Sequence, residues 1–94
     1  MAKIIAALRS AVVPRAGAFS HLSLHELAAP VIQSVIGKAG VRIDQVDELI
    51  VSNALGAGGN PARLCALAAG LPVVVAGLSI DRQCVGGLDA IIRA

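Results

Sequence analysis

The sequence predicts an α/β fold with a mostly parallel sheet and helices on its faces. Three observations indicate this class. Short apolar β-type segments alternate with helix-type segments in the order β-α-β-α-β-α, which is typical of parallel strands joined by right-handed crossovers. Proline and glycine mark the ends of these segments. The 94 residues are 56% hydrophobic and 15% charged, a composition that excludes disorder and a length that allows one domain.

The first strand is predicted at residues 3–8, which are nearly all apolar and are therefore expected to be buried. Residues 9–22 are expected to form a loop. The N-terminal region carries basic residues and no acidic ones, which is also the composition of a targeting leader. The apolar run is too short for a secretory signal, so a buried strand is the preferred interpretation.

The first helix is predicted to begin after Ser23. Ser23 is followed three residues later by Glu26, which is the spacing of a capping box. The helix should end near Ala39, with Gly40 as the left-handed residue that terminates it. Pro30 lies more than one turn inside the helix and predicts a local kink or weakness.

The middle of the chain predicts a second strand and a second helix. Residues 41–47 form a polar connection with room for one turn, and residues 48–53 form the strand. A glycine-rich loop follows at residues 56–60. Asn60 and Pro61 then have the identities preferred at the N-cap and first position of a helix.

The second helix is predicted over residues 62–69 and ends at Gly70. A third strand is predicted over residues 73–80, with an interruption at Gly77. The final helix is predicted over residues 88–94. It is apolar around most of its circumference, which predicts a central layer between two sheets, only one of which this chain could supply.

Cys84 is the main candidate for chemistry, because it stands between the third strand and the final helix. A thiol at a helix N-terminus feels the positive end of the helix dipole, which stabilises the thiolate. The competing interpretation is a small buried apolar residue, which describes most free cysteines. Cys65 lies among aliphatic residues in the second helix and is interpreted as packing. The cysteines are expected to be free thiols in a reducing cytoplasm.

Other function classes find little support in the sequence. The net charge is +2 and the basic residues are scattered, which argues against nucleic-acid binding. The longest apolar stretch is broken by glycine and proline, which argues against a membrane span. The large aliphatic content, with Phe19 as the one aromatic residue, predicts more apolar surface than the chain can cover, and hence a partner subunit or further polypeptide.

Three further stretches could suggest a metal or ligand site, but each has a simpler interpretation. His21 precedes the helix that contains His25, so the two cannot share a helical face as zinc-binding histidines do. No metal site is therefore expected. Residues 56–59 lack the glycine spacing of a dinucleotide loop and the Gly-Lys-Ser/Thr of a phosphate loop. The carboxylates near residues 44–48 are interpreted as a solvated face.

Several stretches together resemble the N-terminal part of the thiolase family, which includes acetyl-CoA acetyltransferases and 3-ketoacyl-CoA thiolases. The resemblance covers essentially the whole chain. The stretches that carry it are Gly59-Asn60-Pro61-Ala62-Arg63, Ala69-Gly70-Leu71-Pro72, Asp81-Arg82-Gln83-Cys84 and Gly87-Leu88-Asp89-Ala90. Asn60-Pro61-Ala62-Arg63 upstream of the cysteine is the most specific of these.

The resemblance implies that the protein is an acyltransferase acting on CoA thioesters, with a role in fatty acid metabolism. Cys84 would accept the acyl group as a thioester. No bound cofactor would be needed, with CoA thioesters as substrates, and no cofactor-binding residue is assigned. It also implies a homo-oligomer and a five-layer α-β-α-β-α architecture. Residues 1–94 would be an incomplete N-terminal domain that ends in the nucleophile helix.

The sequence departs from the family pattern in two ways. Val85-Gly86-Gly87 follows the cysteine where the family usually has Gly or Ala, then Ser, then Gly. Asp81 stands where asparagine is common. More importantly, the Gly-His-Pro and Cys-x-Gly-Gly-Gly motifs of the family's C-terminal half do not occur in these residues. The chain alone is therefore expected to be inactive, and a C-terminal thiolase half is the expected partner.

Two alternatives stay open at this point. The chain could be a non-catalytic truncated remnant that self-associates. It could also be a fragment of a related condensing enzyme, since the helix, loop and strand pattern is shared with that group.

Overall fold

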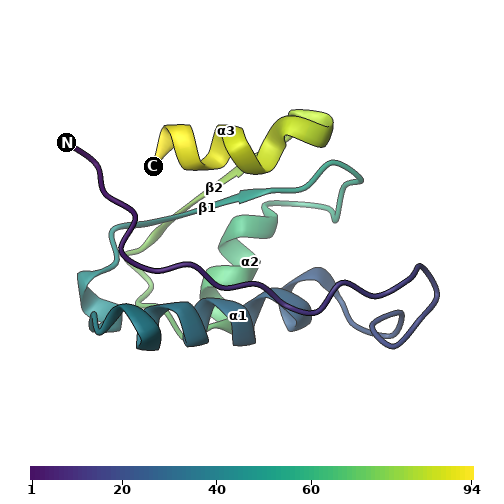
Figure 1. Ribbon diagram of the computed structural model, residues 1–94, viewed down its shortest axis with the longest axis horizontal. Helices are drawn as coiled ribbons and strands as arrows, with labels where there is room; N and C mark the ends of the chain where they lie inside the picture. Colours follow the sequence, from purple (N-terminus) through teal and green to yellow (C-terminus); the bar gives the residue numbers. More distant parts are fainter.

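The computed structural model describes residues 1–94 as a layered α/β unit. Figure 1 shows helix α3 on one face of a two-stranded sheet and helix α2 on the other, with α1 packed against α2. This arrangement confirms the predicted α/β class. The elements, in chain order, are α1 (Leu24–Ala39), β1 (Glu48–Ser52), α2 (Pro61–Ala68), β2 (Ala76–Ile80) and α3 (Gly86–Arg93).

The two strands are parallel, as the alternating pattern predicts. Their register runs from Glu48 opposite Ala76 to Ser52 opposite Ile80. Helix α2 forms the crossover between them. Both strands therefore end on the same side of the sheet, which places the segment after β2 next to the end of β1.

Helix α1 begins and ends where its capping residues predict. Ser23 Oγ accepts a hydrogen bond from the Glu26 N–H, and the Glu26 carboxylate accepts one from the Ser23 N–H. Gly40 has a φ of 70° and ends the helix in the left-handed conformation. Pro30 lies inside the helix without ending it. The predicted turn in the connection is a 3₁₀ turn, η1, at Ile43–Gln45.

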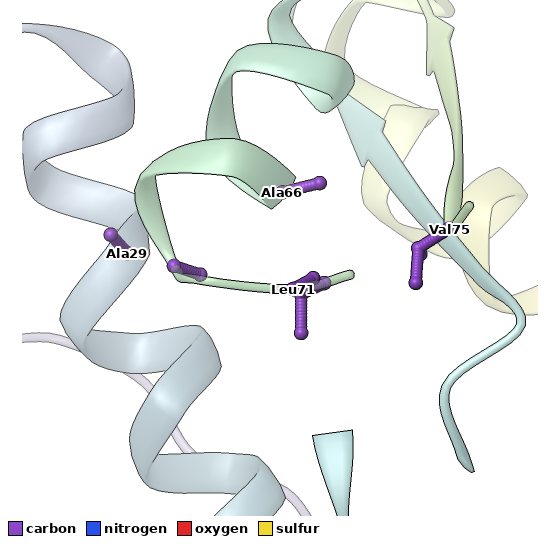
Figure 2. Packing of buried hydrophobic residues seen from close by; sticks show 5 residues of the cluster. Ala29, Ala66, Leu71 and Val75 are labelled. Atoms are coloured by element: carbon purple, nitrogen blue, oxygen red, sulfur yellow. The ribbon is translucent and has the colours of Figure 1, made fainter. Parts of the chain in front are cut away.

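The hydrophobic core lies between α1, α2 and the loop that leads into β2. It consists of three alanines with Leu71 and Val75, and Figure 2 shows Ala29 on α1 and Ala66 on α2, with Leu71 and Val75 on the segment that leads into β2. Only nine residues of the chain are buried. A core this small leaves much of the aliphatic content at the surface.

The prediction of a buried strand at residues 3–8 is wrong for this structure. The segment is extended without regular secondary structure, and Ile4 and Ile5 are 77% and 69% exposed. Its backbone makes no hydrogen bond to another backbone group, and the one hydrogen bond it accepts is from Lys38 Nζ to the Ala7 carbonyl at 3.4 Å. An apolar run becomes a buried strand only when a neighbouring strand pairs with its backbone and other elements cover its side chains. Residues 3–8 have neither a paired strand nor such cover.

The third predicted strand begins later than expected. Val73 and Val74 are exposed in a turn closed by the Val75 N–H, which donates to the Pro72 carbonyl at 3.0 Å. Gly77 does not interrupt the strand, contrary to the prediction. It lies within β2, opposite Leu49.

Helix α3 is covered on one side only. Its inner face packs on β1, while Leu88, Ile91 and Ile92 are 60–69% exposed on the other side. The one-sided cover agrees with the prediction that this chain supplies only one of the two sheets around the helix. None of the helices combines the length and apolar character that crossing a bilayer requires.

Candidate active site at the start of helix α3

Cys84 lies in a 3₁₀ turn, η2 (Gln83–Val85), directly before α3. The helix begins at Gly86, two residues earlier than predicted, so the cysteine immediately precedes the first turn of the helix. The residue is exposed and its thiol is free. The competing interpretation of Cys84 as a buried packing residue is therefore wrong.

The turn that presents Cys84 is held in an uncommon backbone conformation. Gln83 has a φ of 52°, in the left-handed region that residues other than glycine seldom adopt. Its N–H donates to Asp81 Oδ1 at 3.0 Å, which ties the turn to the residue directly after β2. The Val85 N–H donates to the Arg82 carbonyl at 3.2 Å. Strained residues of this kind cluster at functional sites, where the surrounding contacts hold them in place.

Helix α3 is attached to the same turn by its charged residues. Asp89 Oδ2 accepts from Arg93 Nε at 2.8 Å and lies 3.9 Å from Arg82 Nη1. The hydrogen bond from Arg93 is the main reason that the pKa of the Asp89 carboxyl is below its usual value. Because these groups are partly exposed, the ion pairs contribute modestly to stability.

Gly86, the first residue of α3, lies against the end of β1. It is buried, and a Cβ added to it would lie 1.8 Å from Ser52 Oγ and 2.9 Å from Ser52 Cβ. The helix can therefore approach the strand this closely only with glycine at position 86. Gly87, by contrast, has open space where a Cβ would be.

Cys65 differs from Cys84 in its burial. It is fully buried in α2, and burial raises the pKa of its thiol. Its predicted role in packing agrees with this position. No group of three or more His, Cys, Asp or Glu residues, with or without His21 and His25, is arranged to hold a metal ion.

Two hollows lie near the ends of the strands, and Cys84 lines neither of them. An open groove of about 770 Å³ runs between α1 and α3 along β1, and Gln83 is one of its lining residues. A smaller hollow of about 250 Å³ lies beside the glycine-rich loop, at the carboxyl ends of both strands. Asn53 lines both of them, and its buried Nδ2 has no hydrogen-bond partner. Neither Ser52 nor Asn53 was predictable as a site residue, because a polar residue at the end of a strand carries no distinctive signal in the sequence.

The sequence and the fold match a known family. Residues 2–94 fit the sequence model described as the N-terminal domain of thiolases. The chain belongs to the thiolase family. It is similar to an acetyl-CoA acetyltransferase of Cupriavidus necator, with 40% identity over 93 residues that cover 97% of this chain and 24% of that protein.

Solved structures show the same relationship. The Bacillus anthracis acetyl-CoA acetyltransferase has a TM-score of 0.79 and 40% identity, over 82% of this chain and 20% of the other. A thiolase from Ascaris suum, solved in complex with coenzyme A, has a TM-score of 0.77 and 26% identity, over 82% of this chain and 21% of the other. The chain spans about a quarter of the length of the Cupriavidus relative.

Proposed function

We propose that this chain is the nucleophile-bearing N-terminal domain of a thiolase, and that Cys84 accepts an acyl group from a CoA thioester. The observation that carries the proposal is the presentation of an exposed thiol by a strained turn at the start of α3, in a chain of the thiolase family. The coenzyme A bound to the Ascaris suum thiolase supports CoA thioesters as the substrate class.

The proposed step is an acyl transfer between two thiols. Cys84 Sγ attacks the carbonyl carbon of the acyl-CoA, a new carbon–sulfur bond forms, and the bond from that carbon to the CoA sulfur breaks. The proton of the Cys84 thiol ends on the departing CoA thiol. The product is an acyl-Cys84 thioester, which divides one difficult reaction into two easier ones.

Turnover needs more than the nucleophile. These 94 residues contain neither the Gly-His-Pro nor the Cys-x-Gly-Gly-Gly motif that the resemblance assigns to proton transfer. A positioned general acid or base typically contributes about 10²–10⁴-fold to the rate. We therefore propose that the chain alone is acylated slowly at best, and that turnover requires a polypeptide that supplies those groups.

Mass spectrometry of the chain after incubation with acetyl-CoA tests the acyl transfer. The proposal predicts one added acetyl group on the peptide that contains Cys84. The Cys65→Ser variant should behave like the original chain, and Cys84→Ser should remain unmodified. Acetylation that persists in Cys84→Ser, or none at all over long incubation, would contradict the assignment of Cys84.

The second candidate function is a non-catalytic remnant that self-associates, and the uncovered apolar face of α3 is the observation that favours it. Exposed apolar patches of this kind commonly mark interaction surfaces. A remnant would show concentration-dependent association in analytical ultracentrifugation together with no acetylation of Cys84. Acetylation of Cys84 would reject the remnant, whatever the association state.

A further inference from the structure

We propose that Ser52 and Gly86 form a size-matched pair that positions the Cys84 thiol. This inference rests on the proposed function, because it gives Ser52 and Gly86 a positioning role for that nucleophile. Ser52 is the last residue of β1 and Gly86 is the first residue of α3. The pair therefore sets how closely the helix that follows Cys84 can approach the sheet.

The contact leaves no room for a side chain on the helix. An ideal Cβ at position 86 would lie 1.8 Å from Ser52 Oγ. Rotation of the Ser52 side chain could move this hydroxyl away, but Ser52 Cβ would still be 2.9 Å from the added carbon. Such a distance is shorter than real carbon contacts allow, so the helix itself must shift if Gly86 gains a side chain.

A shift at Gly86 reaches Cys84 directly. The Gly86 N–H donates to the Gln83 carbonyl, which closes the turn around Cys84. On the other side of the turn, the Gln83 N–H is tied to Asp81 after β2. The cysteine is thus held between two contacts: Gln83 with Asp81, directly after β2, and Gly86 with Ser52, at the end of β1.

The pair also explains one departure from the family pattern. The family resemblance implies a serine at the position of Gly86, and a side chain there would collide with Ser52. In this chain the Ser52 hydroxyl occupies that space instead. The two positions are therefore expected to vary together, with one side chain present between them.

The test compares four variants by the rate at which iodoacetamide alkylates Cys84, read by peptide mass spectrometry against an added cysteine peptide of constant reactivity. Gly86→Ala adds a side chain to the contact and Ser52→Gly removes one from it. The double variant S52G/G86A again has one side chain between the helix and the strand. Gly87→Ala is the matched control, because the same change on the same helix meets open space. We expect each single variant to change the Cys84 rate by about threefold or more, in line with coupling between contacting residues.

The double variant should return to within about twofold of the original chain, which is the signature of coupling rather than of general damage. Urea unfolding of each variant identifies any that fails to fold. If Gly86→Ala fails to fold, the alkylation rates of Ser52→Gly and S52G/G86A still decide the outcome. Single variants that match Gly87→Ala, or a double variant that restores nothing, would overturn the pairing.

The same preparations separate this inference from the proposed function. A chain in which Cys84 is alkylated but never acetylated by acetyl-CoA refutes the acyl-transfer proposal. The alkylation rates would still decide whether Ser52 and Gly86 position the thiol.

Discussion

Gly77 of β2 lies directly against the backbone of Arg63 in α2. A Cβ at Gly77 would be 2.7 Å from the Arg63 nitrogen and 3.0 Å from its Cα. Backbone atoms cannot move aside as a flexible side chain can, so α2 and β2 reach their observed spacing only because residue 77 is glycine. The Arg63 side chain reinforces the contact, since Nη1 donates to the Val75 carbonyl at 3.0 Å.

Replacing Gly77 with alanine should therefore destabilise the fold. We expect a loss of about 1–3 kcal/mol in the free energy of unfolding, the usual range for an overpacked contact. Urea denaturation followed by circular dichroism measures it. Gly37→Ala is the control, because Gly37 lies in α1 with open space around it. That change should stabilise the helix by about 0.5–1 kcal/mol. Equal effects of the two substitutions would contradict the close contact.

The two cysteines should differ strongly in their reaction with iodoacetamide. Cys84 is exposed, whereas Cys65 is fully buried and the pKa of its thiol is raised by burial. We expect Cys84 to be alkylated first in the folded chain, and both to react in urea. Quantitative peptide mass spectrometry over a time course measures the two rates. Similar rates in the folded chain would show that Cys65 is accessible and would contradict the packing of α2.

Asn60 joins the start of α2 to β2. Its Oδ1 accepts from the Arg63 N–H at 3.2 Å and from the Ser79 hydroxyl, and its Nδ2 donates to the Gly77 carbonyl at 3.0 Å. Loss of the cap alone costs about 0.5–2 kcal/mol. We expect Asn60→Ala to destabilise the chain by about 2 kcal/mol, since it loses the strand contacts as well.

Asn60→Ser provides the matched comparison, because serine can cap the helix but is too short to replace both contacts with β2. Its free energy of unfolding should lie between those of Asn60→Ala and the original chain. If the two variants have equal stability in urea, the contacts with β2 contribute nothing and the cap accounts for the whole effect.

The capping box of α1 should make stability depend on acid pH. The hydrogen bond from the Ser23 N–H is the main reason that the pKa of the Glu26 carboxyl is below its ordinary value of 4.5. A carboxyl with a lowered pKa in the folded state adds stability above the unfolded value, and that stability is lost as the pH falls through the folded value.

Glu26→Gln tests this dependence, since glutamine keeps the acceptor oxygen of a capping box but cannot titrate. Urea unfolding should show that the original chain loses more stability than Glu26→Gln as the pH falls below 4.5. The carboxylate of Asp89 is present in both chains, so its contribution cancels. Parallel pH profiles would contradict the role of Glu26.

The N-terminal segment should exchange its amide hydrogens rapidly. Residues 3–8 form no backbone hydrogen bonds, whereas residues 49–51 lie in the β1 ladder with β2. Hydrogen–deuterium exchange with peptide mass spectrometry should show full exchange of the N-terminal peptide well before the β1 peptide. Protection of residues 3–8 comparable to that of β1 would show that the segment pairs as a strand in solution.

The elements that local chemistry specifies were predictable from the sequence. Ser23 with Glu26, Gly40, and Asn60 with Pro61 each satisfy or end a helix through their own neighbours, and all lie where expected. The alternation of segments also predicted the parallel pairing of β1 and β2. Cys84 was recognisable because its turn lies between a strand and a helix that are close in sequence.

Contacts between distant segments could not be read from the sequence. The apolar residues 3–8 predict a strand, but whether they are buried depends on a ladder and a covering layer, which their own composition does not reveal. Gly77 and Gly86 resemble breaks or turns in the sequence, whereas in the fold they are points of close approach to Arg63 and Ser52. Neighbouring residues specify both ends of α1, the start of α2, the α/β class and the candidate nucleophile, so the sequence was enough to predict them. Burial and the need for glycine depend on how far apart elements distant in the chain lie, so they became known only from the fold.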